Sequence, residues 1–434
     1  MDSLTRFYQL CDPLRPLEAD EEDLYVDWQT QVGLDDVKTL LSNSVTRSTG
    51  VPVTRLFTGH RGTGKTTELK RVKRKLESGE TGRRIFVSFV EAEESLDLQD
   101  VAAPDVVFLM VRQLVSDLRD QKFEFGWQRF TGFVKEFVEL LRGEVQLKGI
   151  DIGADPLKFS VVLKDVPRAR PVLRSLLEGK LPTIYDLVNG EILEEARGFL
   201  RERGFDDILL IVDQLDRIPR KVINGRGLTN DENLFLDHAG TLRALRCHVL
   251  FTIPTELAYS LRRVDLQNAY GADILALPAI PVHDRDGKAC DPGVRSMAEV
   301  VKRRAQKAGL ESSQVFNPPT LLERFVRLSG GHLRSLFVLL RAALDRASHL
   351  PITEDIANRA IRRAASDLAL PLRRREWEAL ERVHATKAPL EGPEEAALWY
   401  DLLCGLYVFA YEDERGRWYD WNPLLGEVPT EDRR

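Results

Sequence analysis

The fold of this chain is decided by the stretch Gly59-His60-Arg61-Gly62-Thr63-Gly64-Lys65-Thr66, GHRGTGKT. It matches the pattern GxxxxGK[ST], in which glycines let backbone N–H groups turn inward around phosphate oxygens without Cβ clashes. A short apolar run at residues 53–58 precedes it, and helix-forming residues 68–77 follow it. This order predicts a phosphate-binding loop that opens a helix, where unpaired N–H groups and the helix dipole favour an anion.

The loop residues predict a bound nucleoside triphosphate with magnesium. Lys65 would reach the β- and γ-phosphates, and the Thr66 hydroxyl would ligate Mg²⁺. We expect the nucleotide to be ATP, with GTP as the alternative, and we expect Lys65 to be exposed in the empty loop. The predicted nucleotide contacts are Gly59, His60, Arg61, Gly62, Thr63, Gly64, Lys65, Thr66 and Thr67.

Near-continuous apolar runs along the chain predict strands that are buried on both faces of a parallel sheet. These strands cover residues 53–58, 84–90, 208–212, 248–253 and 274–280. Amphipathic helices are predicted at residues 34–45 and 105–118. Strands that alternate with helices indicate an α/β fold with a doubly wound parallel sheet, and ligands of such sheets bind at the carboxyl ends of the strands.

Asp213 ends the apolar run at residues 208–212 and is the predicted Walker B carboxylate, which holds magnesium through water. The next residue is Gln214, an amide that cannot act as a base, where many ATPases place the glutamate that polarises water. Asp216 is the candidate to orient the attacking water, with a helix-capping role as its alternative. The amide at position 214 predicts slow hydrolysis.

Two further residues are candidates to read the γ-phosphate. Thr252 places a hydroxyl near the end of the strand predicted at residues 248–253, although threonine is also an ordinary strand residue. Arg334 follows Gly330-Gly331 at the start of a helix, where a glycine pair also serves as plain punctuation.

The pattern along the 434 residues predicts several domains. An N-terminal arm covers residues 1–33, a P-loop ATPase domain residues 34–290, a helical lid residues 291–370 and a winged-helix-like domain residues 371–434. The lid is predicted to be wholly helical at residues 296–368. The last domain shows helices at 374–384 and 393–403, then strands at 406–411 and 418–421, the layout of a winged helix.

An insertion at about residues 121–200 is longer than a plain parallel-sheet domain needs. Alternating apolar residues at 144–150 and 157–163 predict a hairpin inside it. A surface elaboration and a partner-binding device are equal alternatives for its role.

Composition favours a globular cytoplasmic protein. Hydrophobic residues make up 43% of the chain, and 62 basic against 68 acidic residues give a net charge of −6, so nothing attracts the whole chain to nucleic acid or an anionic membrane. The four cysteines have no metal-ligand spacing, which fits reduced thiols. The first 25 residues are acidic and lack an apolar core, so we expect no export signal and no membrane association.

Five stretches resemble, in order and spacing, AAA+ ATPases of the replication-initiator (origin-recognition) branch and their STAND relatives, the signal-transduction NTPases. They are GHRGTGKTT, IVDQLDRI, HVLFTIP, SGGHLRSLFVLLRAAL and PITEDIANRAIRRA. The resemblance covers about residues 25–425 without the insertion. It implies Walker A, Walker B, sensor 1 and a sensor 2 helix in a helical lid, followed by a winged helix, and it makes Arg334 the sensor 2 arginine.

Two positions depart from the family pattern. Gln214 stands where initiators keep glutamate, and Thr252 replaces the asparagine common at sensor 1. The family also implies an arginine supplied by a neighbouring subunit, worth about 10³–10⁵ in rate where it operates. Arg262 and Arg263 are the candidates, with two solvated arginines on a helix as the alternative.

Three functions remain open from the sequence: a STAND-like ATP switch in defence or signalling, a DNA-binding AAA+ protein of initiator or transposition-regulator type, and a non-hydrolysing scaffold. We expect a homo-oligomer and, for a switch, an effector or sensor on a separate polypeptide. Residues 371–434 carry 14 acidic and 9 basic residues, a formal charge of −5, which disfavours DNA despite the basic run 373–375. The switch is therefore the first hypothesis and DNA binding the alternative.

Overall fold

The computed structural model describes residues 2–143, 164, 170–223, 227–392 and 394–433. The chain forms two compact units. The sheet unit comprises Lys38–Thr58 and Arg71–Leu275, and the helical unit comprises Met1–Val37, Gly59–Lys70 and Ala276–Arg434. The N-terminal arm and the phosphate loop thus belong to the same compact unit as the C-terminal half, and the linear domain limits stay a prediction.

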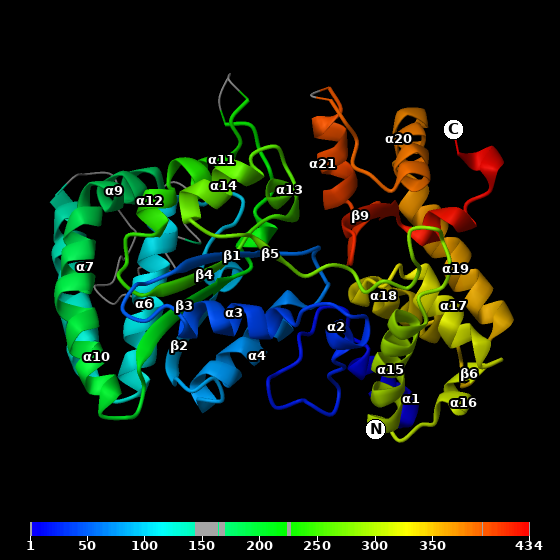
Figure 1. Ribbon diagram of the computed structural model, residues 1–434, viewed down its shortest axis with the longest axis horizontal. Coiled ribbons are helices and arrows are strands. Elements are labelled where there is room, and N and C mark those ends of the chain that lie inside the picture. Colours follow the sequence, from blue (N-terminus) through cyan, green and yellow to red (C-terminus); the bar gives the residue numbers. More distant parts are fainter. Residues whose placement is uncertain (1, 144–163, 165–169, 224–226, 393, 434) are drawn as a thin grey trace. The chain divides into compact units, whose positions relative to one another are not determined.

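The sheet unit is built on five strands in the order β2-β3-β4-β1-β5 (Figure 1). Their bounds are β1 Thr54–Thr58, β2 Ile85–Glu91, β3 Asp207–Asp213, β4 His248–Thr252 and β5 Leu275–Ala276. The pairs β1/β4, β3/β4 and β2/β3 are parallel. The predicted strands and the α/β fold are confirmed, with parallel pairing from β1 to β4 and with β5 shorter than expected.

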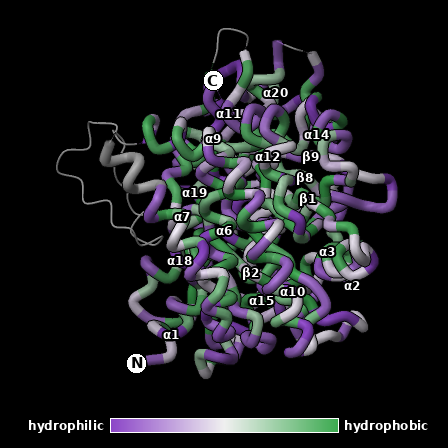
Figure 2. Tube along the Cα trace, turned by 90° about the vertical axis from the view of Figure 1, so that its left-hand side faces the viewer, coloured by the Kyte–Doolittle hydropathy of each residue, from purple (hydrophilic) through white to green (hydrophobic). Residues whose placement is uncertain are grey.

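Apolar side chains explain why these strands are central. All residues of β4 and all but the first of β3 are buried, as a strand covered on both faces requires. Helix α6 (Ala103–Asp120) packs against β2 and β3, and α14 (Arg263–Tyr270) packs near β1. Figure 2 marks the apolar residues of the strands and of α6 in green. Helices lie on both faces of the sheet in Figure 1, so the sheet is doubly wound.

Short helices complete the sheet unit. They are α3 (Val37–Thr46), α5 (Ala92–Ser95), α11 (Asn230–Glu232), α12 (Ala239–Leu242) and α13 (Thr255–Ala258). Helix α4 (Lys65–Ser78) begins in the helical unit and ends in the sheet unit.

The insertion is helical where it is described. It contains α7 (Glu124–Gly143), α9 (Arg170–Leu187), a π-helical turn at Val188–Ile192 and α10 (Leu193–Arg201). The hairpin predicted at residues 144–150 and 157–163 lies outside the described residues.

The helical unit contains two N-terminal helices and a bundle that follows the sheet. These are α1 (Ser3–Leu10), α2 (Trp28–Gln31), α15 (Asp291–Lys307), α16 (Ser312–Val315), α17 (Thr320–Leu328), α18 (Leu333–Leu344) and α19 (Glu354–Ala369). The prediction of a wholly helical lid was wrong in one respect. Two-residue strands β6 (Phe316–Asn317) and β7 (Ile352–Thr353) pair in parallel, because a register this short leaves no periodic signal in the sequence.

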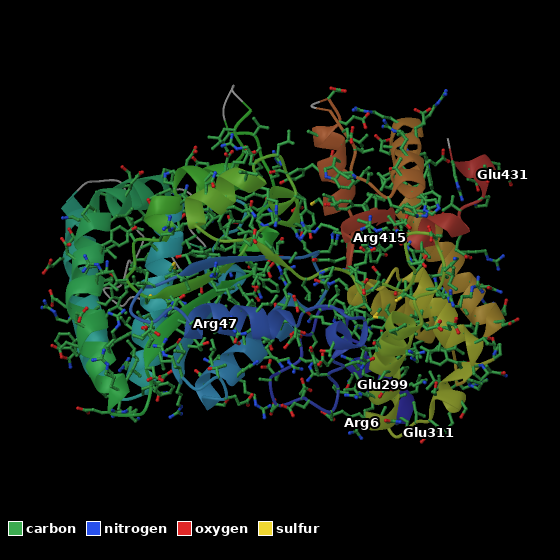
Figure 3. The ribbon with its side chains drawn as sticks, in the orientation of Figure 1. Arg6, Arg47, Glu299, Glu311, Arg415 and Glu431 are labelled. Atoms are coloured by element: carbon green, nitrogen blue, oxygen red, sulfur yellow. The ribbon has the colours of Figure 1, made fainter. Side chains whose placement is uncertain are left out.

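The C-terminal segment has the predicted elements. Helices α20 (Arg374–Thr386) and α21 (Ala396–Cys404) precede the antiparallel pair β8 (Val408–Asp413) and β9 (Gly416–Trp421). Trp418 stacks on Tyr411 with ring centroids 4.5 Å apart, and both side chains are buried. Charged side chains occupy exposed turns, such as Arg415 between β8 and β9 and Glu431 near the C-terminus (Figure 3). Helices followed by a hairpin agree with the winged-helix layout, which stays a prediction.

Candidate nucleotide-binding site

The phosphate loop has the backbone that its glycines were predicted to permit. Gly59, Gly62 and Gly64 have φ angles of 151°, 96° and 104°, a region that side chains other than glycine rarely adopt. The loop is closed by Thr63, whose hydroxyl donates to the His60 carbonyl at 2.9 Å. Helix α4 begins at Lys65, directly after the last of these glycines. The loop therefore leads into a helix N-terminus, the arrangement that binds phosphate.

Lys65 is buried rather than exposed, so the expectation of an exposed lysine was wrong. Only 6% of the residue is accessible. Its Nζ donates to the carbonyl oxygens of Gly59 at 2.5 Å and His60 at 2.9 Å, and these contacts hold the side chain folded into the loop. The Lys65 ammonium group is therefore bound to carbonyl oxygens, and the phosphate oxygens of a nucleotide would compete with them for it.

Three consecutive loop residues bond to segments far along the chain, all inside the helical unit. The Arg61 carbonyl accepts from His332 Nε2 at 2.7 Å, and the Gly62 carbonyl accepts from the Arg334 N–H at 3.2 Å. His60 Nε2 accepts from the backbone N–H of Ala410 in β8 at 2.9 Å. The loop is thus attached to the start of α18 and to the C-terminal hairpin.

The tautomers of the two histidines follow from these contacts. His332 Nδ1 accepts a hydrogen bond from the N–H of Ser335 at 3.2 Å and caps α18. The ring proton therefore lies on Nε2, which donates to the Arg61 carbonyl. His60 accepts at Nε2, so its proton lies on Nδ1. Phe409 packs between them, stacked on His332 with centroids 5.2 Å apart and edge-on to His60 at 5.8 Å.

Both histidines are neutral. Burial lowers the pKa of His60 to about 3, and the proximity of His332 and of the charged Lys65 acts in the same direction. Burial likewise lowers the pKa of His332 to about 3, assisted by the charges of Arg334 and Lys65 and opposed by the bond to Arg61. His60 was predicted as a nucleotide contact and His332 was not, because the stretch GGHLR carries no chemical signal beyond its arginine.

Arg334 lies against the phosphate loop, as a residue that reads the γ-phosphate would need to. A Cβ placed on Gly62 would come within 2.5 Å of Arg334 Cβ and 2.9 Å of its Nε, so only glycine fits there. The Arg334 Nε also donates to the Pro13 carbonyl of the N-terminal arm at 3.2 Å. The guanidinium is therefore held between the loop and the arm.

The N-terminal arm makes three more contacts with the segment that follows the loop, none of which the sequence indicated. The Leu17 N–H donates to the Thr67 hydroxyl at 3.0 Å, and the Tyr25 hydroxyl donates to Glu68 at 2.9 Å. Glu18 forms an ion pair with Lys70 at 2.6 Å. The arm has no periodic pattern, so contacts of this kind leave no trace in it.

In the sheet unit, polar residues end three neighbouring strands. Glu91 ends β2 and is the register partner of Asp213, which ends β3. Thr252 ends β4, one residue beyond the pair Val212 and Phe251. Asp213 and Thr252 are buried, and the Thr252 hydroxyl has no hydrogen-bond partner among the described residues. The two predicted residues therefore share the carboxyl edge of the sheet with Glu91, which the sequence analysis did not single out.

Gln214 has a left-handed backbone, with φ at 69°. Its N–H donates to Asp213 Oδ1 at 2.7 Å, and its side-chain amide donates to Glu91 Oε2. Asp216 lies on a 3₁₀ turn, Leu215–Arg217, and is buried. The role of Asp216 in orienting water stays a prediction.

The sequence signal for Glu91 was its position directly after the strand predicted at residues 84–90.

The arginines proposed to act on a neighbouring subunit both have partners in the sheet unit. Arg262 pairs with Asp265 at 2.8 Å and is half exposed. Arg263 donates to the carbonyls of Ala258 at 3.2 Å and Ile274 at 3.4 Å. Arg262 is the more available of the two, and the role of each stays a prediction.

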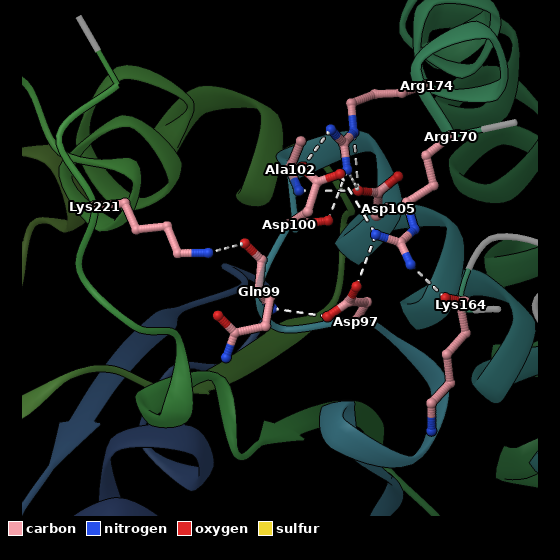
Figure 4. Close-up of polar contacts among 9 residues, drawn as sticks. All are labelled: Asp97, Gln99, Asp100, Ala102, Asp105, Lys164, Arg170, Arg174 and Lys221. Atoms are coloured by element: carbon pink, nitrogen blue, oxygen red, sulfur yellow. Dashed lines mark hydrogen bonds and ion pairs between the residues drawn. The ribbon is translucent and has the colours of Figure 1, made fainter. Parts of the chain in front are cut away.

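The insertion is tied to the connection between β2 and α6 by ion pairs (Figure 4). Arg170 pairs with Asp97 at 2.7 Å, and Arg174 pairs with Asp100 at 3.0 Å and Asp105 at 2.8 Å. Burial raises the pKa of Asp105, against the opposing effect of Arg174. Helix α9 thus holds the segment that follows Glu91, a structural role that the sequence did not indicate.

The predicted magnesium ligands supply oxygen, the donor that Mg²⁺ prefers. A threonine hydroxyl at position 66 and the strand-end carboxylate of Asp213 suit an ion that keeps several waters and takes phosphate oxygens. Among the described residues, no group of three or more His, Cys, Asp or Glu side chains is placed to hold a metal ion.

No helix in the described part of the chain is long and apolar enough to cross a membrane.

No known family model matches the chain, and no curated protein matches it in sequence. Solved structures with a similar fold include the ORC2 protein of Aeropyrum pernix in its ADPNP–ADP complexes, at 15% identity over 91% of this chain and 90% of that one, with a TM-score of 0.42. The Walker-type ATPase of Pyrococcus abyssi has 15% identity over 96% and 99%, with a TM-score of 0.43. Aeropyrum pernix ORC1 in complex with DNA has 12% identity over 93% and 92%, with a TM-score of 0.39.

Proposed function

We propose that this chain is a P-loop ATPase of AAA+ type that binds ATP with magnesium, hydrolyses it slowly and uses it as a conformational switch. The observation that carries the proposal is the attachment of three consecutive loop residues, 60–62, to β8, His332 and α18. A phosphate group entering the loop acts on these hydrogen bonds directly. Nucleotide state is thereby coupled to the start of α18 and to the C-terminal hairpin.

ATP binding follows from the chemistry of the loop. The Lys65 ammonium exchanges the Gly59 and His60 carbonyls for β- and γ-phosphate oxygens, which are charged and accept stronger hydrogen bonds. Thr66 and Asp213 would hold Mg²⁺, which when bound would neutralise charge on the β- and γ-phosphates. Gln214, directly after Asp213, cannot itself take a proton, which favours slow hydrolysis.

Arg334 is the part of the switch that distinguishes ATP from ADP. Its Nε bonds to the Pro13 carbonyl, a neutral acceptor. A γ-phosphate is a charged acceptor and wins this competition, because a charge-assisted hydrogen bond is about twice as strong as a neutral one. The bond between Arg334 and the Pro13 carbonyl of the N-terminal arm breaks when Arg334 turns to ATP and forms again after hydrolysis.

The ATP-bound state, in which Arg334 has left the Pro13 carbonyl, engages a partner. We propose that it forms a homo-oligomer in which the half-exposed Arg262 reaches the nucleotide of a neighbouring copy. Two classes of partner are candidates for the ATP-bound state: a separate effector or sensor protein, and duplex DNA.

The acidic C-terminal segment supports the protein partner. Its basic run is exposed, but Arg374 pairs with Glu378 at 2.8 Å and Arg375 donates to the Glu394 carbonyl at 3.3 Å. Trp399 and Trp418 are buried in the segment's own core. Little cationic surface is left there for phosphates, which supply most non-specific DNA affinity.

A loop after β3 supports DNA. Arg220, which pairs with Glu232 at 3.5 Å, and Lys221, whose Nζ donates to the Gln99 carbonyl at 3.0 Å, precede the aliphatic residues Val222 and Ile223, of which 67% and 50% is exposed. Cations beside exposed aliphatic side chains suit a minor groove, where the cations meet phosphates and the aliphatic groups wedge between base steps. DNA binding through this loop is the second candidate function.

Three measurements with the full chain test these proposals. Isothermal titration with ATP and magnesium tests binding, and mass photometry with and without ATP tests assembly. Fluorescence anisotropy with random duplex at low and moderate salt separates the partners. Salt-sensitive binding that is lost in Arg220→Ala/Lys221→Ala and kept in Arg374→Ala/Arg375→Ala would place DNA first, whereas no binding at micromolar protein leaves the protein partner.

A further inference from the structure

We propose that Glu91 is the general base that activates water for hydrolysis, and that Gln214 is its positioning residue. The inference rests on the proposed ATPase function and names the residue that receives the proton, whereas Asp216 was predicted to orient the attacking water. In this pair the amide comes directly after Asp213 and the carboxylate lies on the adjacent strand.

The strands place Glu91 beside the magnesium ligand. β2 and β3 pair along seven residues, and the last pair is Glu91 with Asp213. Register partners in parallel strands share a face of the sheet, and neighbouring strands lie about 4.8 Å apart. Glu91 is thus one strand spacing from Asp213, with a side chain one methylene longer, at the edge where ligands of parallel sheets bind.

Gln214 is held in a strained conformation that serves this contact. A left-handed backbone is unusual for glutamine, and here it follows a strand directly. Its side chain crosses to β2 and donates to Glu91 Oε2, which fixes the orientation of the carboxylate. An amide in this position cannot take a proton, but it orients the group that can.

A second observation points to a ligand at this pair. The Gln214 Oε1 atom is buried and has no hydrogen-bond partner among the described residues, in a residue that is only 7% exposed. A buried carbonyl oxygen without a donor is costly, and a water molecule is the simplest donor that fits. A water shared by Gln214 Oε1 and the Glu91 carboxylate has one acceptor for each of its protons.

The other acidic residues near this edge are less suited. Glu93 is paired with Arg217, which neutralises it. Asp216 lies beyond the strand end on the 3₁₀ turn and is 6% exposed, whereas Glu91 is half-buried, so solvent reaches it. Of Glu91, Glu93 and Asp216, Glu91 is the residue that lies in a strand, so the pairing of β2 with β3 fixes its backbone position.

The step balances without another reagent. As the water oxygen attacks the γ-phosphorus, one water proton passes to the Glu91 carboxylate. The new bond from oxygen to phosphorus forms while the bond from the γ-phosphorus to the β,γ-bridging oxygen breaks. The products are ADP and inorganic phosphate, and Glu91 then returns its proton to solvent.

The test compares Glu91→Gln with the exposed neighbour Glu94→Gln as matched control. Single-turnover hydrolysis should fall at least about 100-fold in Glu91→Gln and stay within threefold of wild type in Glu94→Gln. The affinity for a fluorescent ATP analogue should stay within threefold in both. Glu91→Gln purified after incubation should retain ATP, while the wild type retains ADP.

An exchange variant, Glu91→Gln/Gln214→Glu, keeps the hydrogen bond and moves the carboxylate to position 214. It should recover at least tenfold of the rate lost in Glu91→Gln, which also shows that the loss was not misfolding. Hydrolysis by Glu91→Gln within threefold of wild type, with ATP bound normally, would overturn the assignment. A wild-type chain that binds no ATP would instead overturn the proposed function, and Glu91 with it.

Discussion

His60 Nε2 accepts a hydrogen bond from the backbone N–H of Ala410 at 2.9 Å, although the two residues are 350 positions apart in the chain. Both residues are buried, and Phe409 beside Ala410 packs edge-on against the His60 ring. The second residue of the phosphate loop is therefore a structural part of the C-terminal hairpin. Any change at His60 affects the hairpin and the loop together.

His60→Leu should lower the free energy of unfolding by about 1–3 kcal/mol, because the buried Ala410 N–H loses its acceptor. Urea denaturation followed by circular dichroism measures the change. His349→Leu is the matched control, since His349 is exposed, and it should have little effect. Equal stability of His60→Leu and wild type would contradict the structural role of this bond.

Stability should fall as the pH falls from about 6.5 to 4.5. The pKa of both His60 and His332 is about 3 in the folded chain, and an unfolded histidine has a pKa near 6.5. In this window the unfolded chain binds more protons than the folded chain, so each histidine removes up to about 1.4 kcal/mol per pH unit. Above pH 6.5 their stabilisation is fully present.

The variant that isolates one of these histidines is His60→Gln, because glutamine keeps an acceptor for the Ala410 N–H but does not titrate. Urea denaturation at pH 7.5, 6.5, 5.5 and 4.5 should give a slope of stability against pH that is reduced by up to about 1.4 kcal/mol per pH unit relative to wild type. An unchanged slope would show that His60 is not held neutral in the folded chain.

Lys65→Ala should weaken ATP binding by about 100-fold or more, since each hydrogen bond from a charged group contributes about 1.5–3 kcal/mol. Isothermal titration with ATP and magnesium measures the effect. Lys70→Ala on the same helix is the control, because Lys70 pairs with Glu18 of the arm. Unchanged affinity in Lys65→Ala would remove the basis for a nucleotide site at residues 59–66.

Gly62→Ala should destabilise the helical unit and weaken ATP binding together. The new Cβ would lie 2.5 Å from Arg334 Cβ, and the φ of 96° is strained for any other residue, which together cost about 1–3 kcal/mol. Gly132→Ala in α7 is the control, because nothing lies within 4 Å of its added Cβ and alanine favours a helix. Thermal unfolding and ATP titration of both variants decide the prediction, and matching behaviour of the two would contradict it.

Local patterns predicted the strands, the glycine loop and the order of helices, because each depends on residues that are neighbours in sequence. The run at residues 208–212 is apolar throughout and became β3, and the loop glycines have the positive φ angles that phosphate binding needs. Asp213 and Thr252 were placed at strand ends and were found there.

The contacts that give the site its character depend on tertiary packing instead. The bonds from Arg61 to His332 and from His60 to Ala410 join segments more than 270 positions apart, and no local period encodes them. The burial of Lys65 was missed for the same physical reason, because the acceptors of its ammonium exist only once the loop has closed. Glu91 was missed because its importance comes from the residue opposite it on another strand.

The stacked pair of Trp418 and Tyr411 places an intrinsic fluorescent probe in the C-terminal hairpin. The Tyr411 hydroxyl donates to the Gly330 carbonyl at 2.7 Å, just before α18, and Trp418 is almost fully buried against the Tyr411 ring. Tryptophan emission depends on the polarity and mobility of its surroundings, so a shift of the hairpin against α18 changes both wavelength and intensity. Because the chain has six tryptophans, the part of a stopped-flow fluorescence change that is lost in Trp418→Phe would report on a movement of this hairpin.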